Sequence, residues 1–415
     1  MTVPGTRSGQ PLPDGWRWVR LREVIAEVQA GFACGLRDPQ GIAQLRMNNL
    51  DTRGNFVWDD VLRVPREAND IDQFQILPGD VLFNNTNSTE LVGKSALFEG
   101  YVEPIVYSNH FTRLRTVDES LLPDFLASWL NHQWQQGVFA AICNRWIGQS
   151  AVKADKLLNL AIPLPTLSEQ WRISGVLREQ MEALEKARTA AQVRLEAVKA
   201  LPAAFLRQVF PQPGQPLPNG WRWVKLGEVC EKQTGIRDPR TEPETVFQYV
   251  DITSVSNQRK CITEARTVLG IDAPSRARQV IRANDIIVAT TRPNLNAVAQ
   301  VPSELDNQIC STGFCVLRTG VGILPDYIFA FVRYESFIEA LTDLVKGALY
   351  PAVTDGQVKA QQIPLPPLSE QRRIAGLLRE QMTAVEKARA AAEAELNTIT
   401  ALPAALLLRA FAGEL

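Results

Sequence analysis

Apolar and small residues recur at alternating intervals of three and four along two long stretches of this chain. The first stretch follows Pro165, and the second follows Pro366, about 200 residues later. Such spacing puts one stripe along a helix and is typical of a coiled-coil seam. The predicted seam consists, in chain order, of Ile173, Leu177, Leu184, Ala187, Ala191, Val198, Leu201, Ile374, Leu378, Val385, Ala388, Ala392, Ile399 and Leu402.

The two stretches are copies of one sequence, because IPLPTLSEQWRI at 162–173 returns as IPLPPLSEQRRI at 363–374. Ser168 and Ser369 can cap a helix, and the acidic residue after each favours its positive first turn. We therefore expect helices at 168–201 and 369–402, each ending before a proline and roughly 50 Å long. The repeat favours a mutual antiparallel pair, and the alternative is two separate helices that each pack against their own domain.

A second repeat opens each half of the chain. QPLPDGWRWVRLREV at 10–24 returns as QPLPNGWRWVKLGEV at 215–229. The Pro-Asp/Asn-Gly sequence predicts a tight turn, and the alternating tryptophans predict a short half-buried strand. Alternating aromatic residues can also stack on nucleic-acid bases, but core packing is the commoner role and the one we expect here. The tryptophans are Trp16, Trp18, Trp221 and Trp223.

Between each opening and its helix lies a segment of short strands and a few helices that differs far more between the halves. Asp80 and Asp285 each precede a short apolar strand, and Asp124 and Asp326 each mark a helix start. We therefore predict an α+β chain: two mixed α/β domains joined by two long helices that form an antiparallel coiled coil, as a pseudo-twofold internal repeat. The predicted parts are a first domain at 10–161, a helical region at 162–210, a second domain at 211–362 and a helical region at 363–412.

Polar loops follow the central apolar strand of both domains. Asn pairs with adenine through two hydrogen bonds and Arg pairs with guanine in the same way, so these loops are candidate base readers, although Asn and Thr are also ordinary loop residues. Basic residues nearby are candidate phosphate contacts, with a solvated surface as the alternative. The candidates are Arg37, Arg46, Asn84, Asn85, Thr86, Asn87 and Lys94 in the first domain and Arg259, Lys260, Arg276, Arg278, Thr290, Thr291, Arg292 and Asn294 in the second.

Composition limits the classes of protein that fit. The chain has 415 residues, which is too long for one core, and its 45% hydrophobic content is that of an ordinary globular protein. It shows no apolar run long enough to span a membrane, and its six cysteines are scattered, so we expect a cytoplasmic protein. A net charge of −1 gives no overall attraction to nucleic acid, so partner proteins are expected to supply part of any DNA affinity.

Motifs of catalysis are missing from the sequence. Gly93-Lys94-Ser95 resembles the end of a phosphate-binding loop, but Ser88 stands where that motif needs glycine. Pro123-Asp124 and Pro325-Asp326 resemble the first acid of a metal-dependent nuclease, yet an aspartate at a helix start needs no catalytic reason. The sequence has no nucleophile elbow and no cofactor loop. We therefore expect no catalytic residue, no metal and no cofactor bound by this chain.

The doubled IPLP-x-LSEQ-x-RI with its long helix, and the doubled PLP-x-GW-x-W opening, resemble the specificity subunit of type I restriction-modification systems. The likeness spans nearly the whole chain. It implies two target-recognition domains that each read one half of a split, asymmetric target in double-stranded DNA. It also implies that the paired helices set the spacer and dock two methyltransferase subunits, which would bind S-adenosylmethionine, with restriction subunits joining when present. The competing hypothesis is a scaffold whose two lobes bind other proteins.

Overall fold

The computed structural model describes residues 12–117 and 119–415 and divides the chain into two compact units. The first unit contains the chain up to Ala191 together with Glu395–Leu415, and the second contains Gln192–Ala394. Gln10 and Pro11, the first residues of the repeated opening, lie outside the described residues. Among the described helices, none combines the length and apolarity needed to cross a membrane.

The first unit is built around an antiparallel sheet with the strand order β2-β9-β5-β7. All four residues of β5 are buried, because the sheet is covered on both faces. Val81 and Phe83 belong to the core that includes helix α3, whereas Leu82 belongs to a second core under the β4-β3-β8 sheet. The bounds are β2 Ile25–Ala30, β3 Ile42–Leu45, β4 Leu62–Val64, β5 Val81–Asn84, β7 Ser95–Leu97, β8 Ile105–Tyr107, β9 Phe111–Thr116, α3 Pro123–Gln135 and α4 Val138–Ile142.

The second unit repeats this plan with different residues. Ile286 and Val288 of the central strand β19 point into the core with helix α8, and Ile287 points into a separate core on the other face. As β3 pairs with β8 in the first unit, β14 pairs in parallel with β21 here. The bounds are β14 Val246–Val250, β17 Arg266–Leu269, β18 Ala277–Ile281, β19 Ile286–Ala289, β20 Val298–Gln300, β21 Gln308–Ser311, β22 Phe314–Leu317, α8 Pro325–Phe331, α9 Glu335–Asp343 and α10 Asp355–Lys359.

The repeated opening and the repeated IPLP segment pair with each other in both units. Strand β1 (Arg17–Arg20) is antiparallel to β12 (Ala161–Leu164), and β13 (Arg222–Lys225) is antiparallel to β23 (Gln362–Leu365). Trp16 packs edge-to-face on Phe125 with ring centroids 6.4 Å apart, and Trp221 packs against the core of the second unit. These contacts confirm the core interpretation for both tryptophans.

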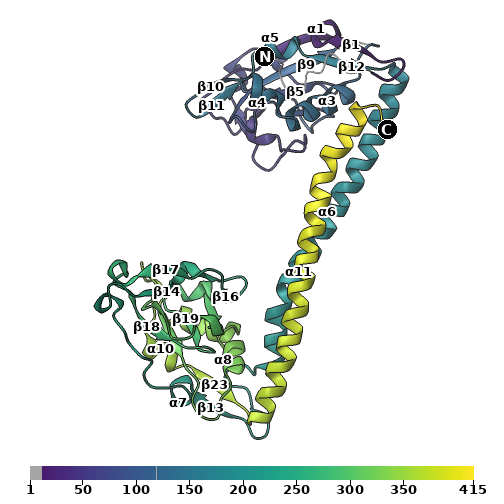
Figure 1. Ribbon diagram of the computed structural model, residues 1–415. Helices are drawn as coiled ribbons and strands as arrows, with labels where there is room; N and C mark the ends of the chain where they lie inside the picture. Colours follow the sequence, from purple (N-terminus) through teal and green to yellow (C-terminus); the bar gives the residue numbers. More distant parts are fainter. Residues whose placement is uncertain (1–11, 118) are drawn as a thin grey trace. The chain divides into compact units, whose positions relative to one another are not determined.

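Two long helices, α6 (Leu167–Val209) and α11 (Leu368–Phe411), begin directly after the IPLP strands. In each unit they lie side by side with opposite directions (Figure 1). In the first unit, Ile173 of α6 shares a core with Leu406 of α11, and in the second unit Leu206 of α6 shares a core with Ile374 of α11. The predicted antiparallel pairing is therefore confirmed within each unit, and the helix ends also pack into the domains.

The predicted ends of both helices were wrong. Each helix begins one residue earlier than its serine, so Ser168 and Ser369 lie inside the first turn and cannot be N-caps. Each also continues through its proline, Pro202 or Pro403. A proline inside a helix costs about 3 kcal/mol. The apolar residues that follow are buried in the cores of the two units, and their burial offsets this cost.

The predicted seam was wrong at four positions, because Ala187, Leu201, Ala388 and Leu402 are exposed. The prediction placed the middle seam residue three positions after Leu184 and Val385, but the inward-facing residue lies four positions after them. Arg188 and Arg389 occupy such positions and are half-buried, since the methylene stem of an arginine can cover apolar surface. The stripe also includes Met181, Leu195, Met382 and Leu396, which the sequence pattern missed.

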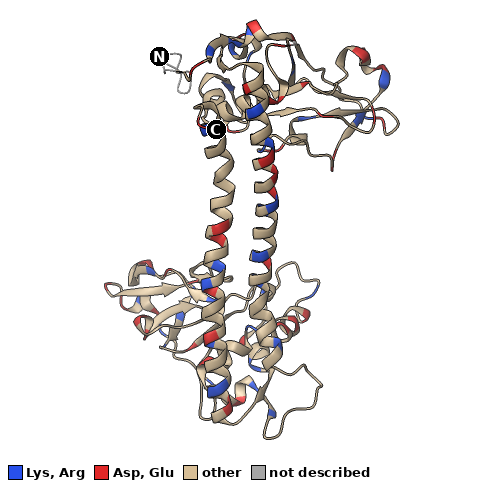
Figure 2. Ribbon diagram, turned by 90° about the vertical axis from the view of Figure 1, so that its right-hand side faces the viewer, with Lys and Arg blue, Asp and Glu red and all other residues tan. Residues whose placement is uncertain are grey.

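The other ten seam residues are buried or half-buried: Ile173, Leu177, Leu184, Ala191, Val198, Ile374, Leu378, Val385, Ala392 and Ile399. Charged residues of both signs occur along α6 and along the first part of α11 (Figure 2). Residues 396–408 of α11, in contrast, contain no charged side chain.

Candidate functional site

A buried glutamine joins each long helix to its domain. Gln170 accepts a hydrogen bond from the Leu122 amide (2.9 Å) and donates to the carbonyl oxygens of Ser120 (3.0 Å) and Pro165 (3.1 Å). Gln371 makes the same three bonds to Leu324, Gly322 and Pro366. The glutamine of the repeated LSEQ motif therefore holds the segment before α3 or α8 against the long helix.

A buried aspartate fixes the start of each central strand. Asp80 accepts from Nε of Arg115 (2.6 Å) and from the Leu77 amide (2.8 Å). Asp285 accepts from Nη2 of Arg318 (2.7 Å) and from the Arg282 amide (2.8 Å). Because both units use the same bonds, the loop that follows each central strand leaves the sheet from an equivalent, rigid position.

In the first unit this loop is a closed network of asparagines. Asn84 is fully buried, and its amide group donates to the carbonyl oxygens of Thr86 (3.1 Å) and His110 (2.9 Å). Asn87 in turn donates to Oδ1 of Asn84 (2.7 Å). The interpretation of Asn84 as a base reader was wrong, because its side chain is enclosed and fully bonded inside the protein. Its role is to shape the loop that presents its neighbours.

Asn85, Thr86 and Asn87 are half-buried and remain at the surface of this network. The Asn85 side chain donates to Oγ1 of Thr112 (3.0 Å) and accepts from Oγ1 of Thr86 (2.7 Å). Its backbone bonds to His110 on one side and to Val152 on the other. The loop is thus held between the β8–β9 turn and the end of a hairpin.

The second unit places Thr290 in the same backbone position. The Thr290 amide donates to Gly313 (2.9 Å), and its carbonyl oxygen accepts from Val353 (2.9 Å). Thr290 is buried and its hydroxyl donates to Gly313, so its predicted role as a base reader was wrong for the same reason as for Asn84. Thr291 is half-buried, whereas Arg292 and Asn294 are exposed. Arg292 has φ 50°, a strained backbone conformation of the kind that collects at functional sites.

An exposed apolar tip stands beside the polar loop in both units, and no sequence pattern predicted it. In the first unit, strands β10 (Asn144–Trp146) and β11 (Gln149–Ala151) form a hairpin that pairs with Thr86 and Asn87. Trp146 and Ile147 at its tip are exposed. In the second unit Leu349 and Tyr350 are exposed, three and two residues before Ala352, which forms a bridge with Thr291. We interpret the two tips as candidate contact points beside the polar loops.

The three basic candidates of the first unit have different positions. Arg37 is exposed on the loop between β2 and β3, and Arg46 is half-buried with Asp60 at 3.5 Å. Lys94 is buried, and its ammonium donates to the carbonyl oxygen of Leu50. Burial lowers the pKa of Lys94, and the nearby Asp51 opposes that shift. The prediction of a phosphate contact by Lys94 was therefore wrong.

In the second unit, Arg259 and Arg276 are exposed, whereas Lys260 is bound internally. The Lys260 ammonium donates to the carbonyl oxygen (2.6 Å) and to Oδ1 (2.9 Å) of Asn296. Burial, with a smaller contribution from Arg333, lowers the pKa of Lys260 to about 8. This ammonium fixes the loop of Asn296, so it is not a free phosphate contact.

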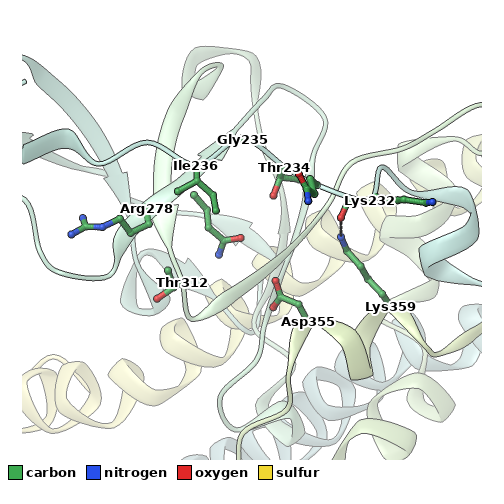
Figure 3. Close-up of a pocket in the computed structure, with 10 residues that line it drawn as sticks. Lys232, Thr234, Gly235, Ile236, Arg278, Thr312, Asp355 and Lys359 are labelled. Atoms are coloured by element: carbon green, nitrogen blue, oxygen red, sulfur yellow. Dashed lines mark hydrogen bonds between the residues drawn. The ribbon is translucent and has the colours of Figure 1, made fainter. Parts of the chain in front are cut away.

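Arg278 lines a groove of about 820 Å³ on the second unit, together with Lys232, Ile236 and Thr312. Asp355 and Lys359 rise from α10 along its lower edge, and Lys359 reaches the loop carbonyl of Lys232 (Figure 3). Burial raises the pKa of Asp355, and Lys359 opposes that shift. Three basic residues and one acidic residue give this groove a local positive charge that the whole chain lacks.

The described residues contain no group of His, Cys, Asp or Glu side chains that could hold a metal ion. The two units present one framework that carries different side chains. Each has a polar loop beside an exposed apolar tip, and the second unit adds a groove with local positive charge. This arrangement defines a recognition protein with two related but unlike binding faces.

Comparisons with known proteins agree with this class. A family model described as the type I restriction modification DNA specificity domain matches residues 218–395. The type I restriction enzyme MjaX specificity subunit of Methanocaldococcus jannaschii is 25% identical over 403 residues, with 89% of this chain and 87% of that protein covered.

Two solved structures are similar over almost their whole length. The HsdS subunit from Thermoanaerobacter tengcongensis is 25% identical with a TM-score of 0.62, and the match covers 99% of this chain and 100% of that one. A structure from work on complex assembly and conformational transition of the type I R-M system is 26% identical with a TM-score of 0.77, covering 98% and 100%. Over nearly its whole length, the chain is therefore similar to type I restriction-modification specificity subunits.

Proposed function

We propose that this chain is the specificity subunit of a type I restriction-modification system, and that each of its domains reads one half of a bipartite, asymmetric DNA target through the loop that follows its central strand. The observation that carries the proposal is the shared position of Asn85 and Thr290, which make equivalent backbone bonds within otherwise different loops. An identical frame with unlike side chains is what two readers of different sequences need. Asn85, Thr86 and Asn87 present amide and hydroxyl groups, whereas Thr291, Arg292 and Asn294 present a different set.

The long helices supply the spacing in this proposal. Helix α6 has 43 residues and α11 has 44, and each is continuous from one unit into the other. Two half-sites on one face of a duplex lie about one turn, roughly 34 Å, apart. A stiff helical pair can hold two readers at such a separation, so the bases between the half-sites would not be contacted.

The same helices offer a docking surface for partner subunits. Leu201 and Leu402 occupy equivalent positions in the repeat and are both exposed, although the helical pattern places them near the seam. Exposed leucines that recur once per helix suit two copies of one partner. We propose that two methyltransferase subunits dock here and supply S-adenosylmethionine, and that restriction subunits join the assembly where a system has them. A cytoplasmic location stays a prediction.

Methylation by the reconstituted complex tests the function. The pure chain with S-adenosylmethionine and duplex DNA is expected to transfer no methyl group. Adding the methyltransferase subunit, called the modification subunit below, should produce methylation at one bipartite sequence. Mapping methylated sites in cells with and without the gene should give the same sequence. Methyl transfer by the pure chain would contradict the proposal.

Binding to random duplex DNA separates DNA recognition from a protein scaffold. Affinity that falls steeply as salt rises indicates phosphate contacts, and a scaffold would show no such dependence. The measurement should be made with and without the modification subunit, because the net charge of −1 limits the affinity of the chain alone.

A further inference from the structure

Five consecutive residues are almost identical in the two domains, within segments that otherwise differ widely. The first copy is Gly35-Leu36-Arg37-Asp38-Pro39, and the second is Gly235-Ile236-Arg237-Asp238-Pro239. We call these the GΦRDP loops, where Φ is the aliphatic residue. In the first unit the loop joins β2 to β3, and in the second it precedes β14.

The fold explains the aspartate of this motif. Asp38 accepts the Gln40 amide with its carboxylate (2.9 Å) and the Gly41 amide with its carbonyl oxygen (2.9 Å). Asp238 does the same with the amides of Arg240 (3.0 Å) and Thr241 (3.1 Å). Both copies therefore form one turn, which sets the direction of the chain as it enters the next part of the domain.

The fold does not explain the aliphatic residue. Leu36 is 69% exposed and Ile236 is 80% exposed, and neither belongs to a core cluster. A single exposed aliphatic side chain is ordinary. Its presence at the same place in both copies, on the same turn, indicates a contact that both domains make and that the isolated chain leaves open.

The surroundings of the loops indicate the chemistry of that contact. Ile236 lines the groove with Lys232, Arg278 and Lys359, and the one acidic residue of this lining is Asp355. Arg278 is also paired with Asp238 (3.2 Å), so Lys232 and Lys359 carry the excess positive charge, which favours a polyanion. Thr312, at the turn next to Gly313, lines the same groove, so Ile236 lies close to the reading loop. In the first unit, the carbonyl oxygen of Phe32, at the start of the loop, accepts a hydrogen bond from the Asn109 amide. The carbonyl oxygen of Asn109 in turn accepts from the side chain of Asn85, so this loop also lies close to the polar loop of its unit.

Two half-sites of an asymmetric target differ in base sequence but share the sugar-phosphate backbone. The GΦRDP sequence is nearly the same in both domains, whereas the polar loops after the central strands differ. It therefore suits a contact with the sugar-phosphate backbone, which is the same in both half-sites. We propose that the GΦRDP loops are sequence-independent DNA contacts, in which Leu36 and Ile236 pack against deoxyribose while neighbouring basic groups face the phosphates. This inference rests on the proposed function and adds a surface that reads no base. The opposing possibility is that the loops dock the modification subunit, which is also common to both halves.

The test uses the full chain in complex with its modification subunit, carrying Leu36→Ser, Ile236→Ser or both. Val102→Ser and Val321→Ser are matched controls, because these valines are 92% and 103% exposed in other loops of the same units. Dissociation constants are measured for the specific duplex, for duplexes with one half-site scrambled, and for random duplex. Association with the modification subunit is measured separately without DNA, and thermal unfolding checks that each variant is folded.

Each single variant is expected to weaken binding to every duplex by the same factor, roughly fivefold to tenfold, because one aliphatic side chain no longer packs against the sugar. The double variant should show about the product of the two factors, since distant sites act independently. Specificity, salt dependence and subunit association should stay at their wild-type values, and the valine controls should bind normally.

Three results overturn the inference alone: wild-type affinity in the double variant, weakening confined to one half-site, or weakened association with the modification subunit. A wild-type complex that binds no duplex DNA overturns the proposed function and this inference with it. The two failures are therefore distinguishable in one set of measurements.

Discussion

The imidazole of His132 stacks on the ring of Phe411, with ring centroids 5.4 Å apart and planes inclined by 24°. His132 belongs to α3, and Phe411 is the last residue of α11. The second unit has the corresponding pair of Tyr334 and Phe210, at 5.6 Å and 32°. In each unit, aromatic contacts of this kind pack the end of a long helix against the domain.

This stacking predicts a dependence of stability on pH. Burial lowers the pKa of His132 from 6.5 to about 4. The unfolded chain therefore binds a proton as the pH falls below 6.5, while the folded chain does not until about pH 4. The free energy of unfolding should fall as the pH falls through this window, by up to about 3 kcal/mol, and His132 contributes nothing to the pH dependence above it.

The wild type and His132→Phe should be compared by urea unfolding at pH 7 and pH 5. The variant should lose less stability at pH 5, and His110→Asn is the control. An identical loss in the wild type and His132→Phe would show that His132 is not the group responsible.

Replacing Gln170 by leucine should destabilise the first unit by about 2–4 kcal/mol, because three backbone groups, in one buried and two partly buried hydrogen bonds, lose their partner. Gln371→Leu should have the same effect on the second unit. Thermal unfolding measures both, and Gln180→Leu on the exposed side of α6 serves as the control. If Gln170→Leu unfolds at the wild-type temperature, the anchoring role is refuted.

The salt dependence of DNA binding should distinguish buried from exposed basic residues. Arg276→Gln is expected to lower the slope of log affinity against log salt by about 1, as for the loss of one phosphate contact. Lys94→Met should leave that slope unchanged, because the Lys94 ammonium is buried against Leu50. A reduced slope for Lys94→Met would mean that this side chain reaches DNA after all.

Adding one heptad to both α6 and α11 should change the spacer of the target and leave each half-site intact. Seven residues lengthen a helix by roughly 10 Å. Methylation mapping with the altered subunit measures the spacer directly, and a heptad added to α6 alone is the control, since it breaks the pairing of the seam. An unchanged spacer in the double insertion would refute the role of the helices in spacing.

Local sequence signals predicted much of this architecture. The period of three and four residues predicted two paired helices, and the turn and alternating tryptophans predicted the opening strands. The errors have physical causes. Pro202 and Pro403 were expected to end the helices, but burial of the residues beyond them outweighs the local cost of proline. Ala187 and Leu201 fit the helical period, yet a change in phase places Arg188 inward instead.

The candidate site was harder to predict than the fold. Asn84 and Thr290 looked like base readers, and Lys94 and Lys260 looked like free cations, because residue type and position in a loop are visible in sequence. Whether such a side chain is enclosed depends on segments far away along the chain, such as the His110 turn around Asn84 and the Asn296 loop around Lys260. The exposed tips at Trp146 and Tyr350 had no signal, since a hydrophobic residue is expected to be buried.

The sequence alone determined that this protein is a repeat of domain and helix without catalytic motifs, and its repeated motifs already resembled the specificity subunits. Repeats and periods are local patterns, and local hydrogen bonds and helical geometry obey them directly. Only the tertiary structure decided which polar groups face solvent and which hold loops in place. That decision depends on long-range packing, where an enclosed amide is stable only if distant backbone groups complete its hydrogen bonds.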